Sequence, residues 1–106
     1  MNTSKNKFDS IEKLIFEEDL RIKSVYFDIT SDQITVLLTN LHSIVVPISK
    51  FERLKDASEE TLKSYELIGG GTGIHWEELD EDLSLKGFLN DYLRNKIKNE
   101  ELLVIA

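Results

Sequence analysis

The sequence predicts an α+β fold: a small antiparallel sheet, a three-strand meander, packed with short helices in a single domain. Three short runs rich in β-branched and aliphatic residues follow one another at 22–29, 33–39 and 43–48, a composition typical of strands. The segments between them, 30–32 and 40–42, are polar-leaning and of hairpin length, so neighbouring runs are expected to pair antiparallel. Segments with helical spacing flank these runs on both sides.

Length and composition limit the class of protein. The chain has 106 residues, of which 41% are hydrophobic and 31% charged, as in a globular protein of one domain. It has no cysteine, which excludes a disulfide scaffold and a thiol enzyme. No apolar run reaches the roughly 18–20 residues that span a bilayer, and residues 1–7 lack the apolar stretch of a signal peptide. We therefore expect a cytoplasmic protein that does not bind membranes.

The net charge argues against one class of partner. The chain carries 13 Lys+Arg against 20 Asp+Glu, a formal net charge of -7. Generic binding to a nucleic-acid backbone requires an excess of basic residues. We therefore expect no direct binding to DNA.

The first predicted element is an N-terminal helix over 8–19. Phe8, Ile11, Leu14 and Ile15 lie at the spacing that places them on one face of a helix. Acidic residues follow this apolar group, where they oppose the helix macrodipole and help to end the helix.

Helical segments follow the third strand, which ends at Pro47. Proline has no N–H, so it is expected at the edge or the exit of the sheet. Ser49 and Ser58 are the predicted N-caps of two short helices, and Ser84 is that of a last helix. The last helix has an apolar stripe, formed by Leu85, Phe88, Leu89, Tyr92 and Leu93. The apolar tail 102–105 is expected either to add a strand to the sheet or to pack on a second copy of the chain as a homo-oligomer.

Four of the five glycines lie between 69 and 73, which invites comparison with a phosphate-binding loop. The segment lacks a following Lys-Ser/Thr pair and does not match G-x-G-x-x-G. The acidic segment 77–82 comes just after it and would repel a nucleotide. The glycines therefore predict a structural turn.

The acidic segment 77–82, with His75 just upstream, raises the question of a metal site. Hard divalent cations prefer several oxygen ligands, but the spacing lacks the glycine that an EF-hand loop needs for its sharp turn. A solvated acidic turn ahead of the last helix is the favoured interpretation, so the sequence predicts no cofactor and no metal ligand set. The alternative is a ligand- or metal-binding site in 69–82 that uses His75 with Asp80 or Asp82.

No catalytic residue is predicted. The chain has no G-x-S-x-G elbow and no cysteine nucleophile. His75 stands between two apolar residues, which is typical of a hydrogen-bonded structural histidine. Trp76, the sole tryptophan, is either a core anchor whose indole N–H finds a partner or a hot spot for a binding partner.

Three strings carry a resemblance to a known family: GGGTGIHW at 69–76, LDEDLS at 79–84 and GFL at 87–89. Together they resemble the bacterial domain-of-unknown-function family 2442. The resemblance covers 22–89 of a single domain, 1–106. The helix 8–19 and the C-terminal helix and tail, 84–106, which begin inside the end of the matched range, extend this core at its two ends. The chain departs from the family pattern at Glu52 and Glu77, where proline is frequent, at Tyr65, where tryptophan is frequent, and at 40–42, which replaces an Asp-Gly-Arg turn.

The resemblance implies a role rather than a reaction. Members of the family are small α+β domains, sometimes fused to a helix-turn-helix and often encoded beside toxin-like small proteins, which implies an antitoxin-like or regulatory role. No helix-turn-helix is evident here, and the acidic balance favours a basic protein partner. We therefore predict a non-enzymatic interaction module. Its candidate partner-binding residues are Gly71, Gly73, His75, Trp76, Asp80, Glu81 and Asp82. A nucleic-acid mimic of the phage-inhibitor type is a further alternative.

Overall fold

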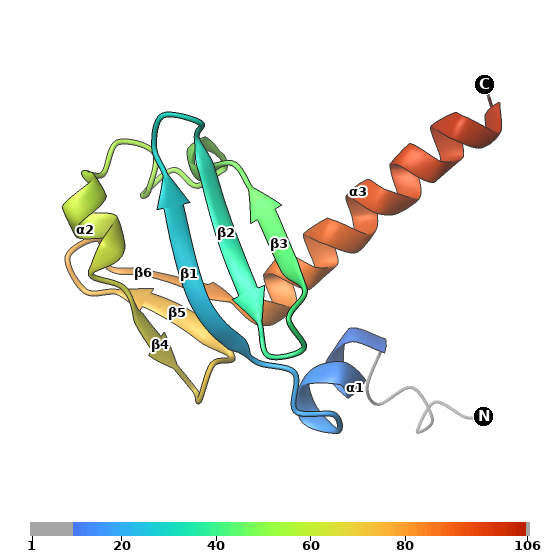
Figure 1. The fold of residues 1–106 in the computed structure, drawn as a ribbon, viewed down its shortest axis with the longest axis horizontal. Coiled ribbons are helices and arrows are strands. Elements are labelled where there is room, and N and C mark those ends of the chain that lie inside the picture. The colour runs from blue at the N-terminus through green and yellow to red at the C-terminus, as the bar shows by residue number, and fades with distance from the viewer. Residues whose placement is uncertain (1–9, 106) are drawn as a thin grey trace.

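The computed structural model describes the backbone of residues 10–105 and the side chains of residues 10–96 (Figure 1). Phe8, near the start of the predicted N-terminal helix, lies outside the described residues. The elements are, in order, α1 (Ser10–Phe16), β1 (Ile22–Asp28), β2 (Gln33–Leu38), β3 (Ser43–Val46), the 3-10 helix η2 (Ile48–Lys50), α2 (Glu59–Lys63), β4 (Glu66–Ile68), β5 (Gly73–Trp76), β6 (Glu81–Ser84) and α3 (Leu85–Ile105). The predicted α+β class is confirmed.

The first three strands form the predicted antiparallel meander, which we call sheet A, in the order β1-β2-β3. Its register places Val25 opposite Val36 and Val36 opposite Ile44. All three of these side chains are buried, because residues opposite one another in antiparallel strands share a face of the sheet. The predicted N-terminal helix is confirmed as α1, which ends at Phe16 rather than at residue 19. It buries Ile11 and Ile15, whereas Leu14 of the predicted apolar face is exposed.

The sequence did not predict a second antiparallel sheet, sheet B, with the order β4-β5-β6. The segment 77–82 was expected to be a turn throughout, but only 77–80 form a turn and Glu81 and Asp82 belong to β6. Sheet B exists because Ile74 and Trp76, on the inner face of β5, are completely buried. Burial of these two side chains offsets the weak strand preference of the glycine and acidic residues around them.

The helix caps were predicted in part. Ser58 is the N-cap of α2, and its side chain accepts a hydrogen bond from the N–H of Thr61. The predicted cap at Ser49 is wrong, because η2 begins directly after Pro47 and contains Ser49. The backbone N–H and the hydroxyl of Ser49 instead donate to the carboxylate of Asp32, at 2.9 and 2.6 Å. Ser49 therefore binds the side chain of Asp32 in the β1–β2 turn instead of capping a helix.

Helix α3 begins as predicted, because Ser84 Oγ accepts a hydrogen bond from the N–H of Gly87 at 3.0 Å. The apolar stripe is buried only as far as Leu89, whereas Tyr92 and Leu93 are exposed, and the helix projects from the body of the protein (Figure 1). The tail continues α3 through Ile105. The expected additional strand is therefore wrong, because the helix already pairs the backbone groups of this segment. Self-association through the tail stays a prediction.

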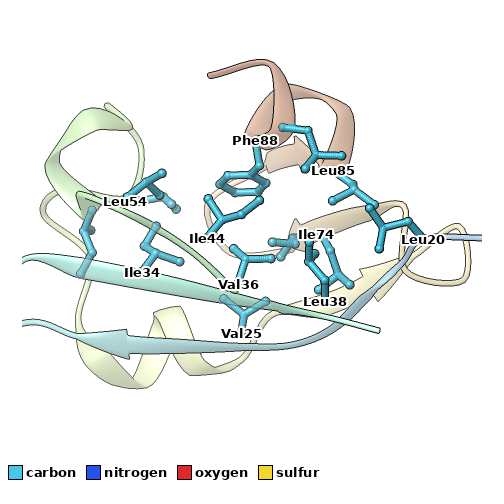
Figure 2. Close-up of a cluster of buried hydrophobic side chains, with 14 of the residues drawn as sticks. Leu20, Val25, Ile34, Val36, Leu38, Ile44, Leu54, Ile74, Leu85 and Phe88 are labelled. Carbon is cyan, nitrogen blue, oxygen red and sulfur yellow. The ribbon is translucent and has the colours of Figure 1, made fainter. Parts of the chain in front are cut away.

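One hydrophobic core joins the two sheets and α3. Figure 2 shows side chains from sheet A (Val36, Ile44), from sheet B (Ile74) and from α3 (Leu85, Phe88) pointing into one cluster. No polar or charged residue is fully buried among those whose side chains are described. In the described part of the chain, no helix has the length and apolar character needed to cross a membrane.

Candidate functional site

The outward face of sheet B gathers charged side chains around one histidine. Because Ile74 and Trp76 point into the core, His75 between them points outward. The register places Glu66 of β4 opposite His75 on one side and Asp82 of β6 opposite it on the other. Residues opposite one another in antiparallel strands share a face. A row of side chains, Glu66–His75–Asp82, therefore crosses the sheet.

Both ring nitrogens of His75 are hydrogen-bonded to carboxylates. Nδ1 lies 2.5 Å from Asp82 Oδ1, and Nε2 lies 2.9 Å from Glu77 Oε1. These hydrogen bonds raise the pKa of His75 from 6.5 to about 9, with Glu77 as the larger cause and Asp82 as the next. The imidazole is therefore protonated at neutral pH and donates from both nitrogens. It ties the β5–β6 turn to strand β6.

We call the outward face of sheet B, together with the turn that follows β5, the acidic face. Its exposed carboxylates are those of Glu66, Glu77, Glu78, Asp80 and Asp82. Among the described residues, His75 alone forms ion pairs with these carboxylates. Arg53 lies close to the turn, but its guanidinium donates to the backbone carbonyls of Leu79 and Asp80. The acidic face thus keeps most of its negative charge.

Gly71 has a structural reason to be glycine. Its φ is +106°, and a Cβ there would lie 2.8 Å from the carbonyl oxygen of Ile22. The N–H of Ile22 donates to the carbonyl of Gly71 at 2.8 Å, so this turn joins sheet B to the start of β1. Gly71 and Gly73 are both buried, and neither offers a surface to a partner. The interpretation of the glycine segment as a structural turn therefore has a geometric basis.

Trp76 belongs to the core and not to the candidate surface. Its side chain is 0% exposed, and its indole N–H donates to the carbonyl of Leu62 at 3.0 Å. Phe27 packs edge-on against it. Trp76 was interpreted either as a core anchor or as a hot spot for a partner. The structure supports the core anchor, because a fully buried ring cannot contact a partner protein in this conformation.

Asp80 and Glu81 have local roles at the start of β6. Asp80 has φ +50°, a left-handed conformation that aspartate tolerates better than most residues, and it closes the turn 77–80. Glu81 is half-buried, and its Oε1 accepts a hydrogen bond from the N–H of Asp82 at 3.1 Å. Of the predicted partner-binding residues, the structure therefore brings His75, Asp80, Glu81 and Asp82 together near the surface.

Sequence reasoning missed two parts of this region. Glu66 joins the acidic face only through strand pairing. The available signal was the glycine turn between two short segments, 66–68 and 73–76, that contain β-branched or aromatic residues. The second part is a cleft of about 210 Å³ beside β6, which no local pattern indicates because its walls come from three separate segments. The cleft is lined by Phe51, Asp82, Leu83, Ser84, Gly87, Phe88 and Asp91.

Both ring nitrogens of His75 are engaged in hydrogen bonds, which limits the chemistry open to this residue. A general base needs a nitrogen free to accept a proton, and the carboxylates of Asp82 and Glu77 occupy both nitrogens of His75. Within the described residues, no group of three or more His, Cys, Asp or Glu side chains is placed to hold a metal ion. The geometry thus provides a charged surface held in place by one imidazolium.

Comparison with known proteins identifies a family and two solved structures that are described as of unknown function or uncharacterized. The family model described as "Protein of unknown function (DUF2442)" matches residues 22–92. A protein of unknown function from Rhodospirillum rubrum, known from its crystal structure, is 35% identical with a TM-score of 0.60, over 68% of this chain and 87% of that chain. An uncharacterized protein from Chromobacterium violaceum, known from its NMR structure, is 26% identical with a TM-score of 0.62, over 85% of each chain. No curated protein matches the chain.

Proposed function

Because the chain belongs to the DUF2442 family of proteins of unknown function, we propose a role from its own geometry: a non-enzymatic interaction module, antitoxin-like or regulatory, that binds a basic protein in the cytoplasm. The contact surface is the acidic face of sheet B. The observation that carries this proposal is the gathering of five exposed carboxylates with His75 as their one ion-pair partner among the described residues.

Electrostatics explains what such a surface does. A surface with one sign of charge attracts a partner of the opposite sign and increases the association rate, and salt weakens this effect. Protonated His75 holds Glu77 and Asp82 in fixed positions through its two hydrogen bonds. The carboxylates are therefore partly ordered before the partner arrives, which lowers the entropy cost of binding.

The proposal is tested by capture from extracts of the cells that make the protein. The test variant removes four charges from the acidic face: Glu66→Gln, Glu77→Gln, Glu78→Gln and Asp80→Asn. It leaves Asp82 in place. The matched control removes four exposed charges from α2 and the turn before it, with Glu52→Gln, Asp56→Asn, Glu59→Gln and Glu60→Gln. Both variants therefore have the same net charge.

The wild type and the control are expected to retain the same basic protein, identified by mass spectrometry, and the test variant to lose it. The affinity of the purified pair should fall as salt increases, because several charge pairs contribute to binding. Equal capture by the test variant and the control would contradict the assignment of the acidic face.

A further inference from the structure

We propose that the cleft beside β6 binds an arginine side chain from an extended segment of the partner. This segment pairs with the outer edge of β6, which no other strand of the described residues occupies. This inference rests on the proposed function, because it specifies how the basic partner is recognised. The cleft shares Asp82 with the acidic face but otherwise lies at the edge of the sheet, between β6, Phe51 just after η2, and the first turns of α3.

The size of the cleft suits one side chain. Its volume is about 210 Å³, below the roughly 300–1,000 Å³ of pockets that hold a drug-sized ligand. Gly87 lines it from α3. A Cβ at Gly87 would approach Ser84 Oγ to 3.1 Å. Glycine at this position therefore leaves room for the Ser84 cap and for the cleft.

The walls of the cleft are apolar and aromatic. Phe51 and Phe88 meet edge to face, with ring centroids 6.0 Å apart and an interplanar angle of 68°, and Leu83 lines the cleft beside them. An arginine has a methylene stem that packs on apolar surface and a planar guanidinium that binds to aromatic rings. The walls therefore match both parts of this side chain.

Two carboxylates complete the cleft. Asp82 uses Oδ1 for His75. Asp91 Oδ2 lies 2.5 Å from Lys50 Nζ, and Asp91 Oδ1 lies 3.5 Å from Arg94 Nη1 in a weaker contact. Each carboxylate can accept further hydrogen bonds, because its two oxygens offer about four lone-pair sites. These two contacts show that Asp91 already attracts cationic side chains of its own chain, Lys50 at the shorter distance. An incoming guanidinium, which can bind a carboxylate through two parallel N–H groups, competes with Lys50 for Asp91.

The edge of β6 supplies backbone groups for an extended segment. Leu85 donates to the carbonyl of Thr72 at 2.8 Å, and the register continues as Leu83 opposite Ile74 and Asp82 opposite His75. Antiparallel pairs alternate between hydrogen-bonded and non-hydrogen-bonded, so the C=O of Asp82 and the N–H of Ser84 point away from β5. A peptide can add to such an edge as a further strand. Its side chains then lie beside the cleft.

The test is a titration of the full-length, ¹⁵N-labelled protein with blocked tripeptides, followed by NMR. The probe is acetyl-Val-Arg-Val-amide, the uncharged match replaces arginine with citrulline, and a third peptide carries lysine. We expect chemical-shift changes centred on the amides of 82–91. We also expect arginine to bind about tenfold more tightly than citrulline, as expected for a charge-assisted hydrogen bond. Equal binding of citrulline, or shifts confined to 75–78, would overturn the proposal, and tighter binding of lysine would overturn the choice of arginine.

Two variants sharpen the test because they act in opposite directions. Asp91→Asn should weaken binding of the arginine peptide about tenfold. Lys50→Gln should strengthen binding, because it removes the nearer of the two cations that contact Asp91. An unchanged affinity in both variants would exclude Asp91 from the site. The two proposals also fail separately. If the four-charge variant loses the partner but Asp91→Asn captures it unchanged, the result supports the acidic face as the contact surface and contradicts the cleft as a binding site.

Discussion

Sheets A and B share one architecture but differ in what they present to solvent. Each is an antiparallel meander of three strands with one face in the common core. The outward face of sheet A carries the cross-strand row Tyr26–Thr35–Val45, which has no charge. The equivalent row of sheet B is Glu66–His75–Asp82. Both sheets contribute to the same core. Sheet A presents an uncharged row to solvent, whereas sheet B presents a charged row that suits the charged partner we propose.

The largest expected effect concerns the residue that anchors sheet B. Replacing Trp76 with alanine should lower the free energy of unfolding by about 3–5 kcal/mol, because a large buried side chain and its hydrogen bond to Leu62 are lost. The matched control is Tyr26→Ala, an aromatic residue on sheet A that is 57% exposed. It should cost less than about 1 kcal/mol. Urea denaturation measures both, and similar losses would contradict the anchoring role of Trp76.

A smaller effect is expected at the turn that joins the two sheets. Gly71→Ala should destabilise the protein by about 3 kcal/mol, because the backbone conformation is unfavourable for alanine and the new Cβ meets the carbonyl of Ile22. Gly70→Ala is the control, with φ +66° and no atom within 4 Å of the added Cβ. It should cost only about 1 kcal/mol, the penalty of the left-handed conformation alone. The comparison fails if Gly70→Ala is the more damaging variant.

The smallest effect is a pH dependence that belongs to sheet B. The pKa of His75 is raised in the folded state from 6.5 to about 9 by Glu77 and then by Asp82. The stabilisation from this protonated histidine is therefore fully present below pH 6.5 and is lost as pH rises through about 9. The urea midpoint of the wild type should fall between about pH 6 and about pH 9.5 by more than that of His75→Gln.

NMR titration provides the matched measurement on the histidine itself. Glu77→Gln should lower the pKa of His75, because it removes the larger of the two causes. Two results would contradict the hydrogen bonds between His75 and the two carboxylates. One is a urea midpoint that changes equally with pH in the wild type and in His75→Gln. The other is a pKa of His75 that is unchanged in Glu77→Gln.

The sequence predicted sheet A well because its strands carry their own signals. β1 and β2 span seven and six residues. In β2 the buried Ile34, Val36 and Leu38 alternate with less buried residues, whereas an irregularity between Ile22 and Ser24 interrupts the alternation of β1. Short polar turns separate the strands, so both the strands and their order follow from local patterns. The caps at Ser58 and Ser84 were predictable for the same reason, because a capping side chain acts within three residues of its own position.

Sheet B was not predicted because its signals are non-local. β4 has three residues, and β5 and β6 have four each. Glycine begins β5 and acidic residues begin β6, and both residue types are unfavourable in strands. The acidic segment was identified from composition, but the inclusion of Glu66 and the burial of Trp76 depend on strand pairing and core packing. The cleft depends on the approach of Phe51, β6 and α3 to one another, which no short sequence window contains.

The most direct test of the account is zero-length carbodiimide cross-linking of the captured complex, read by mass spectrometry. The reagent joins a carboxylate to a lysine amine in direct contact with it, so it reports which carboxylates face the basic partner. We expect cross-links from the acidic face, at Glu66, Glu77, Glu78, Asp80 or Asp82. Cross-links confined to Asp28 and Asp32, at the β1–β2 turn of sheet A, would contradict it.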